Sequence, residues 1–79
     1  MTPEHAERRE RVDHHKDGSV RARGMVVGEE LDGYWEWFRK DGTLMRSGSF
    51  DRGVKAGEWT TYDRDGAPYK VQQITPPTA

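Results

Sequence analysis

Hydrophobic and β-favouring residues occur in short runs along the chain, and an Asp-Gly pair separates one run from the next. These pairs, Asp17-Gly18, Asp41-Gly42 and Asp65-Gly66, are evenly spaced, and we call the step from one to the next the repeat interval. Asp-Gly between β-favouring runs is a strong hairpin signal, because glycine accepts the positive φ that a tight turn requires. The pattern therefore predicts hairpins whose turns contain Gly18, Gly42 and Gly66.

Other positions keep the same repeat interval. The matched positions are Gly24 with Gly48, Gly33 with Gly57, Trp35 with Trp59, Val26 with Phe50, and Phe38 with Tyr62. A fixed period indicates one supersecondary unit copied along the chain, and positions shared by the copies are usually structural. We therefore expect the large side chains at these positions to form the core: Trp35, Phe38, Phe50, Trp59 and Tyr62.

The runs predict an all-β fold, a single antiparallel meander of about five strands built from hairpin units of roughly 24 residues. The expected strands cover residues 19–27, 33–39, 43–50, 57–62 and 67–74. The reversals are short, whereas parallel strands would need long crossovers. Each Asp-Gly turn fits either a two-residue turn or a three-residue loop with a glycine bulge. These differ by one residue in pairing, so the register stays open.

The two ends of the chain differ from the hairpin domain, which we place at residues 17–74. Residues 1–16 have a helix-like start at Thr2-Pro3-Glu4 but almost no apolar face, so we expect a disordered arm or a frayed helix. Residues 75–79 contain Pro76 and Pro77 and should form an extended tail outside the sheet.

These residues resemble the MORN-repeat family, closest to its bacterial variant form. The resemblance rests on Gly57-Glu58-Trp59 with Tyr62 and Gly66, and on Gly48-Ser49-Phe50 with Gly53. The first unit departs from the pattern, because Gly28 lies one position early and Val26 replaces the aromatic residue. The resemblance implies stacked hairpins in one twisted sheet. It also implies a role in scaffolding, in membrane association, or as an antitoxin, a label that some bacterial members carry.

Composition narrows the functional classes. Thirteen Lys and Arg residues nearly balance 14 Asp and Glu, so bulk charge gives no sign of a nucleic-acid binder. With no cysteine, the chain has no disulfide, thiolate metal site or thiol nucleophile. No apolar run approaches the ~20 residues that span a bilayer, and no secretory signal is evident, so we expect a cytoplasmic protein.

Four residues are candidates for contact with a partner. Trp37 and Tyr34 have no aromatic counterpart in the next unit, where Thr61 and Glu58 stand, so they are candidates for an exposed platform. Arg46 and Lys70 are one repeat interval apart and should share a face. Such a basic stripe could hold phosphate or a nucleic acid. The alternative is a cross-strand salt-bridge ladder with Glu36 and Asp51.

The sequence gives little support for a metal site, a cofactor or catalysis. His5, His14 and His15 lack converging partner ligands, and Asp63-x-Asp65-Gly66 lacks the later ligands of a calcium loop. We find no nucleophile–base pair and no phosphate-binding loop. We therefore expect no cofactor and no enzyme activity.

Two functions fit these observations. The first is a non-catalytic protein–protein interaction module, with self-association through sheet edges as one form of it. The second is a membrane-surface or nucleic-acid binding module that uses Arg, Lys and exposed Trp.

Overall fold

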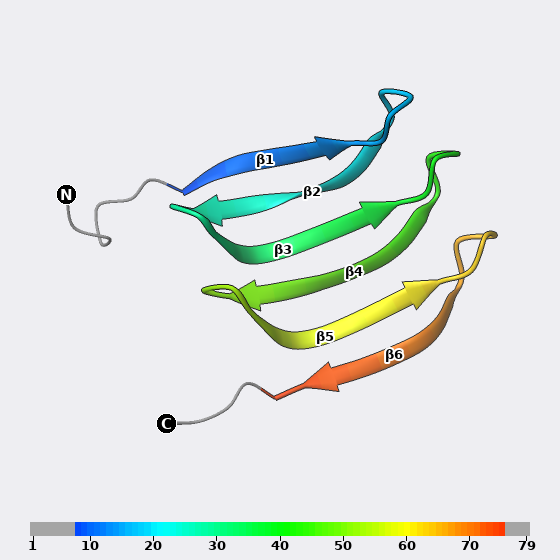
Figure 1. Ribbon diagram of the computed structural model, residues 1–79. Coiled ribbons are helices and arrows are strands. Elements are labelled where there is room, and N and C mark those ends of the chain that lie inside the picture. The colour runs from blue at the N-terminus through cyan, green and yellow to red at the C-terminus, as the bar shows by residue number, and fades with distance from the viewer. Residues whose placement is uncertain (1–7, 76–79) are drawn as a thin grey trace.

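The computed structural model describes residues 8–75, which form one antiparallel sheet of six strands and no helix. Each strand pairs with its neighbours in sequence, giving the order β1-β2-β3-β4-β5-β6 (Figure 1). The expected all-β antiparallel meander is confirmed, with six strands where about five were expected. The strands are β1 Arg8–His14, β2 Val20–Val27, β3 Glu30–Phe38, β4 Leu44–Asp51, β5 Val54–Tyr62 and β6 Pro68–Ile74.

The sixth strand, β1, corrects the expectation of a disordered or frayed-helical arm over residues 1–16. Residues 8–14 pair with β2 from Arg8↔Val27 to His14↔Val20. This strand could not be predicted from the sequence, because Val12 is its only apolar residue. Backbone hydrogen bonds rather than apolar burial attach it to the sheet. Its charged side chains suit an edge strand. The helix start at Thr2 and the tail from Pro76 lie outside the described residues.

The three Asp-Gly hairpins have the three-residue loop with a glycine bulge. In the first, the His15 N–H donates to Ser19 O (2.8 Å) and the Gly18 N–H donates to His15 O (3.0 Å). The same pair of bonds closes the loops at residues 39–43 and 63–67. Gly18, Gly42 and Gly66 have φ values of 93°, 92° and 88°, which only glycine adopts easily. This choice of loop fixes the register that the sequence left open.

Strands β3 and β5 begin earlier than expected. The chain reverses tightly at Gly28-Glu29 and at residues 52–53, and Gly33 and Gly57 lie inside strands instead of ending them. Both glycines have positive φ (79° and 74°) and adjoin irregularities where the pairing register shifts. Glycine inside a strand commonly marks such a bulge.

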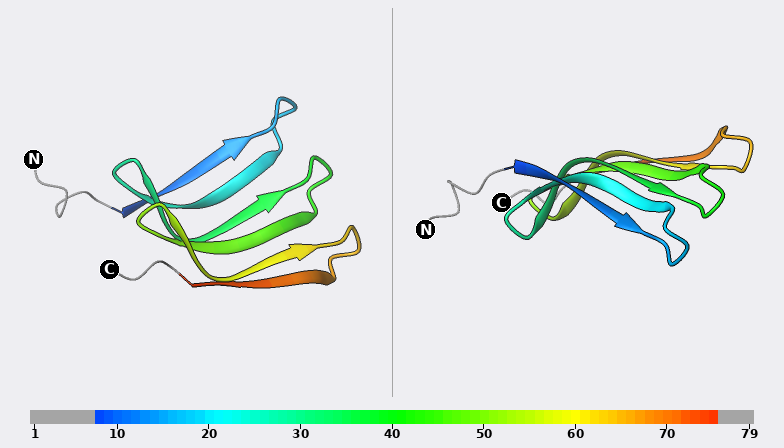
Figure 2. Two further views of the ribbon diagram at one scale, coloured as in Figure 1. Left: turned by 60° about the horizontal axis from the view of Figure 1, so that its bottom comes forward. Right: turned by 90° about the horizontal axis from the view of Figure 1, so that it is seen from above.

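The sheet is a single layer. The molecule measures 43 × 31 × 13 Å, and its thin, twisted outline is visible in Figure 2. Because side chains alternate along a strand, the sheet has two distinct faces. The tryptophan face carries the side chains of Ala22, Trp35, Trp37, Phe50 and Trp59, and the tyrosine face carries those of Tyr34, Glu36, Phe38, Ser47 and Tyr62.

Two tryptophans form the centre of the core by lying flat over glycines on the neighbouring strand. Trp35 and Trp59 are 2% and 6% exposed, and a Cβ added at Gly24 or Gly48 would overlap the indole ring above it. The Trp35 indole N–H donates to Met25 O (2.8 Å). The Trp59 indole N–H donates to Ser49 O (3.1 Å) and to Ala56 O (3.2 Å). Burial of each ring therefore leaves no indole donor unpaired.

The other expected core residues are less buried. Phe50 packs partly buried beside the cluster of Ala22, Val26 and Trp35. Phe38 and Tyr62 lie half-buried on the tyrosine face, where the Arg23 guanidinium lies 5.6 Å from the Phe38 ring centre. A single layer cannot enclose both sets of side chains in one core.

Candidate binding face

Three of the four candidate residues fall in one row across the tryptophan face. Trp37 is the direct cross-strand partner of Arg46, Arg46 of Thr61, and Thr61 of Lys70. The row crosses β3, β4, β5 and β6, and adjacent members of such a row have Cβ atoms about 5 Å apart. The structure thus aligns Trp37, Arg46 and Lys70 on one face, with Trp37 and Lys70 at the two ends of the row, and places Tyr34 on the opposite face.

Trp37 lies between the two core tryptophans. Its ring centre is 5.3 Å from that of Trp59, 6.0 Å from that of Trp35 and 6.1 Å from that of Phe50. The side chain is half-buried rather than a free surface platform. Trp37 therefore both supports the core and presents part of its ring to the outside.

A shallow hollow of about 200 Å³ lies beside this row, over β4, β5 and β6. Arg46, Lys55 and Lys70 line it, together with Trp59, and no carboxylate lines it. The Lys55 ammonium lies 4.8 Å from the centre of the Trp59 ring, a cation–π contact. The hollow therefore combines three positive charges with an aromatic floor.

The cations of the hollow take part in none of the four ion pairs found within residues 8–75. Those pairs are Arg8–Asp32, Arg11–Asp13, Arg21–Asp13 and Arg23–Glu36. The salt-bridge ladder that the sequence allowed does not form with Glu36, because this carboxylate lies on the tyrosine face, 3.0 Å from Arg23. Asp51 follows Phe50 in β4, so its side chain also points to the tyrosine face.

Tyr34 belongs to a polar network on the tyrosine face. Its hydroxyl donates to Glu36 Oε2 (3.1 Å), and the Ser47 and Tyr62 hydroxyls are 3.0 Å apart. Burial, more than the nearby Glu36 carboxylate, raises the pKa of the Tyr34 hydroxyl above its usual value of 10.0. A phenol shifted this way stays protonated at neutral pH and is no ready base or nucleophile. The side chain is nonetheless 53% exposed and so available for contact.

Lys55 was missed by the sequence reasoning. The expected strands 43–50 and 57–62 leave Lys55 in the connection between them, whereas β5 begins at Val54 and pairs Lys55 with Phe50. The available signal was Arg52-Gly53 as a two-residue hairpin turn, a turn type that requires positive φ at both residues. In the structure these φ values are 51° and 86°.

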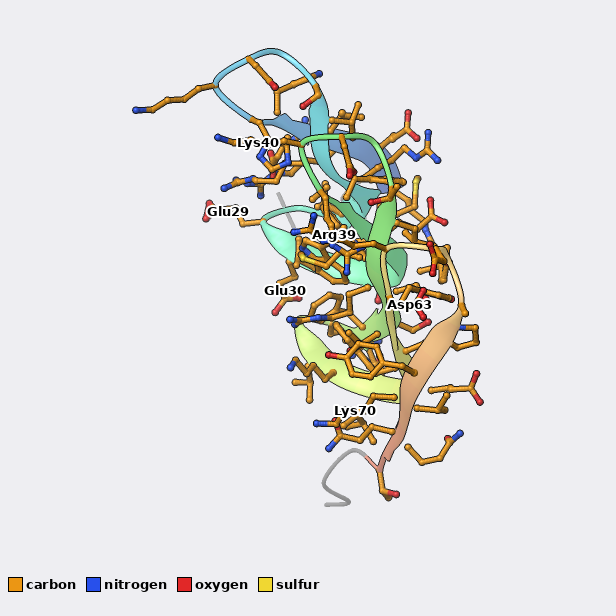
Figure 3. All side chains as sticks on the ribbon, turned by 90° about the vertical axis from the view of Figure 1, so that its right-hand side faces the viewer. Glu29, Glu30, Arg39, Lys40, Asp63 and Lys70 are labelled. Atoms are coloured by element: carbon orange, nitrogen blue, oxygen red, sulfur yellow. The ribbon has the colours of Figure 1, made fainter. Side chains whose placement is uncertain are left out.

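Two further residues tie neighbouring hairpin tips together. An Arg39 guanidinium nitrogen donates to Tyr62 O (2.7 Å), and the His15 Nε2 atom lies 3.0 Å from Phe38 O. Figure 3 shows Arg39 among the hairpin loops, with Asp63 on the next one. His15 and Arg39 are one repeat interval apart, as are their acceptors Phe38 and Tyr62. The spacing was the available signal, but His15 was considered only as a metal ligand.

Within the described residues, no group of three or more His, Asp or Glu side chains converges as a metal site requires. The loop aspartates make local hydrogen bonds instead. Asp41 Oδ1 accepts from the Thr43 backbone N–H (2.9 Å) and hydroxyl (2.7 Å), and Asp17 does the same with Ser19. These bonds to the neighbouring hydroxyl and amide lower the pKa of both carboxyls below the usual 3.8.

Comparison with family models, with curated proteins and with solved structures finds no match for this chain. In the described part of the chain there is no helix long and apolar enough to cross a membrane.

Proposed function

We propose that the chain is a non-catalytic protein–protein interaction module built from MORN-like hairpin repeats. The observation that supports this most is the tryptophan face, where half-buried Trp37 lies in one cross-strand row with Arg46 and Lys70. Residues 8–75 form no second layer above this row. Aromatic residues and arginine dominate the energy of protein interfaces. A face of this kind is suited to a partner that covers it.

Pairs of positions one repeat interval apart make equivalent contacts and support the hairpin repeat. Trp35 lies over Gly24 and Trp59 over Gly48, and their indoles bond to Met25 and Ser49. His15 and Arg39 each contact the next hairpin. By resemblance, the module serves in the cytoplasm as a scaffold or as an antitoxin-type component, with another protein as its partner. Open edges at β1 and β6 allow self-association as a further mode.

A membrane-surface or nucleic-acid binding module is the second candidate. The observation that favours it is that Arg46 and Lys70, within the described residues, form no ion pair. Polyanion binding of this kind weakens steeply with salt.

The experiment is affinity capture from an extract of the source cells, with quantitative identification of the bound protein. Wild type is compared with Trp37→Ala, and with Tyr69→Ala, which removes an aromatic that is 68% exposed on the edge strand β6. We expect one protein in stoichiometric amount, lost with the first variant and kept with the second. Capture of nucleic acid or lipid alone would support the second candidate, and equal capture by all three chains would contradict the assigned face.

A further inference from the structure

We propose that the hollow over Trp59 binds an acidic segment of the partner protein, with carboxylates three residues apart. This inference rests on the proposed function and specifies the chemistry of the partner. The occupant is identified by charge: Arg46, Lys55 and Lys70 line the hollow and no carboxylate accompanies them.

Charge is distributed unevenly between the two faces of the sheet. In the paired rows, the tryptophan face carries Arg9, Arg11, Arg46, Lys55 and Lys70 against Asp13. Arg11 is already paired with Asp13 at 3.1 Å. Although the whole chain has a formal charge of −1, this face is cationic. A local patch of one sign steers and orients an oppositely charged partner even when the net charge is near zero.

The spacing of the cations selects an extended ligand. Arg46 and Lys70 are in one row but two strands apart, which corresponds to about 10 Å. Two carboxylates at that separation can each pair with one of the two cations. In a polyproline II helix, residues i and i+3 point the same way and are about 9 Å apart. An acidic residue at every third position therefore matches the row, while the intervening residues pass over Thr61.

An acidic polypeptide fits this face better than a nucleic acid does. Single-stranded nucleic acids bind by stacking bases on exposed aromatic rings. The rings of Trp35 and Trp59 are only 2% and 6% exposed, and Lys55 already lies against Trp59. The hollow thus offers charge with little exposed ring surface for stacking, which favours carboxylates on an extended chain.

Two acidic residues at the β2–β3 end of the sheet do not neutralise the hollow. Glu29 lies in the β2–β3 turn and Glu30 begins β3. Neither lines the hollow, and Glu30 instead adjoins Gly53 in the β4–β5 turn.

The test is a fluorescence-polarisation titration of the full chain with a labelled (Glu-Pro-Pro)₄ peptide. The matched (Gln-Pro-Pro)₄ peptide keeps the conformation and removes the charge. We expect binding of the glutamate peptide only, with a change in tryptophan fluorescence because Lys55 contacts Trp59. Raising the salt concentration should weaken this binding.

Variants then locate the site. Arg46→Gln, Lys55→Gln and Lys70→Gln should each weaken binding about threefold, the size of one exposed ion pair, and the triple variant about thirtyfold. Lys40→Gln is the matched control, because Lys40 lies at a hairpin loop away from the hollow (Figure 3). Circular dichroism of each variant verifies that the sheet is folded.

The outcomes separate this inference from the proposed function. Failure of the glutamate peptide to bind, or equal loss with Lys40→Gln, overturns the inference. Tighter binding of a ten-nucleotide oligothymidine or of phosphatidylserine vesicles overturns it as well. If the extract still yields a protein partner that the triple variant retains, the proposed function stands without the acidic segment. If the peptide binds but no partner protein is captured, the proposed function alone fails.

Discussion

At the scale of single residues, the tryptophan–glycine pairs explain how so thin a sheet acquires a core. The sequence predicted Trp35 and Trp59 as core residues from their shared interval, and both are buried. It did not predict that Gly24 and Gly48 serve as the surfaces on which the rings lie, because glycine signals a turn more often than a packing surface. The burial of Trp37 was harder to predict from the sequence, because it depends on Trp59, which lies two strands further along the chain.

Gly48→Ala should destabilise the fold, because the new methyl group would overlap the Trp59 ring. Overpacking of this kind costs about 1–3 kcal/mol in the free energy of unfolding. Urea denaturation followed by tryptophan fluorescence measures the change. Gln72→Ala, in the strand on the other side of Trp59, is the control and should have a small effect. Equal midpoints for Gly48→Ala and wild type would show that the ring does not lie on Gly48.

Trp37→Ala should lower stability by less than Trp59→Ala, for which a loss of about 3–5 kcal/mol is expected. Trp37 is half-buried, and its ring contacts three others, whereas Trp59 is almost fully enclosed. Thermal melts of the two variants give the order. If the Trp37→Ala melt coincided with that of wild type, Trp37 would be the free surface platform that the sequence alone suggested.

At the scale of elements, hairpin loops were well predicted and β1 was not. Asp-Gly located all three loops because the requirement for positive φ is local. Strand β1 is specified by pairing with β2, and a run of charged residues gives no periodic signal for it. Arg39 and His15 bond neighbouring hairpin tips, so the loops also help to hold the order of the hairpins.

Stability should fall in acid partly through the loops. Hydrogen bonds lower the pKa of Asp17 and Asp41 in the folded state below the usual 3.8. Their contribution is therefore present above about pH 4 and is lost as pH falls through the lowered values. In the Asp17→Asn/Asp41→Asn double variant, melting temperature should depend less on pH between about 5 and 2.

Asp65→Asn is the matched control for the loop aspartates. It occupies the same loop position, but residue 67 is alanine and provides no hydroxyl, and Asp63 accepts the backbone bonds instead. An acid dependence as steep in the double variant as in the control would show that the hydrogen bonds to Ser19 and Thr43 do not carry the effect.

At the scale of the whole molecule, each strand is bonded only to its neighbours in sequence, so stability should be distributed along the meander. Deleting residues 1–14 should then leave β2–β6 folded, with a lower melting temperature. The deletion removes β1 and its hydrogen bonds, but Val12 is the only apolar residue of that strand. Far-UV circular dichroism shows whether the sheet is folded, and a thermal melt gives the melting temperature. Loss of the β-sheet spectrum would show that β1 is essential to the fold.

Because the sheet is a single layer, one face must supply both the core and the contact surface. Arg46 and Lys70 were candidates because one repeat interval separates them, and Trp37 was a candidate because the next unit has no aromatic counterpart. These three residues lie in one row. It could not place Lys55, whose position depends on where the β4–β5 turn falls. The basic hollow exists only once the register of three strands is set.

An NMR titration of the ¹⁵N-labelled chain with the (Glu-Pro-Pro)₄ peptide tests whether the tryptophan face is the binding surface. We expect shifts of the Trp59 indole N–H, which bonds to Ser49 and Ala56, and of backbone amides near Arg46, Lys55 and Lys70. Amides around Tyr34 and Glu36, on the opposite face, should shift little. Shifts centred on that opposite face, or none at saturating peptide, would contradict the assignment of the tryptophan face as the binding surface.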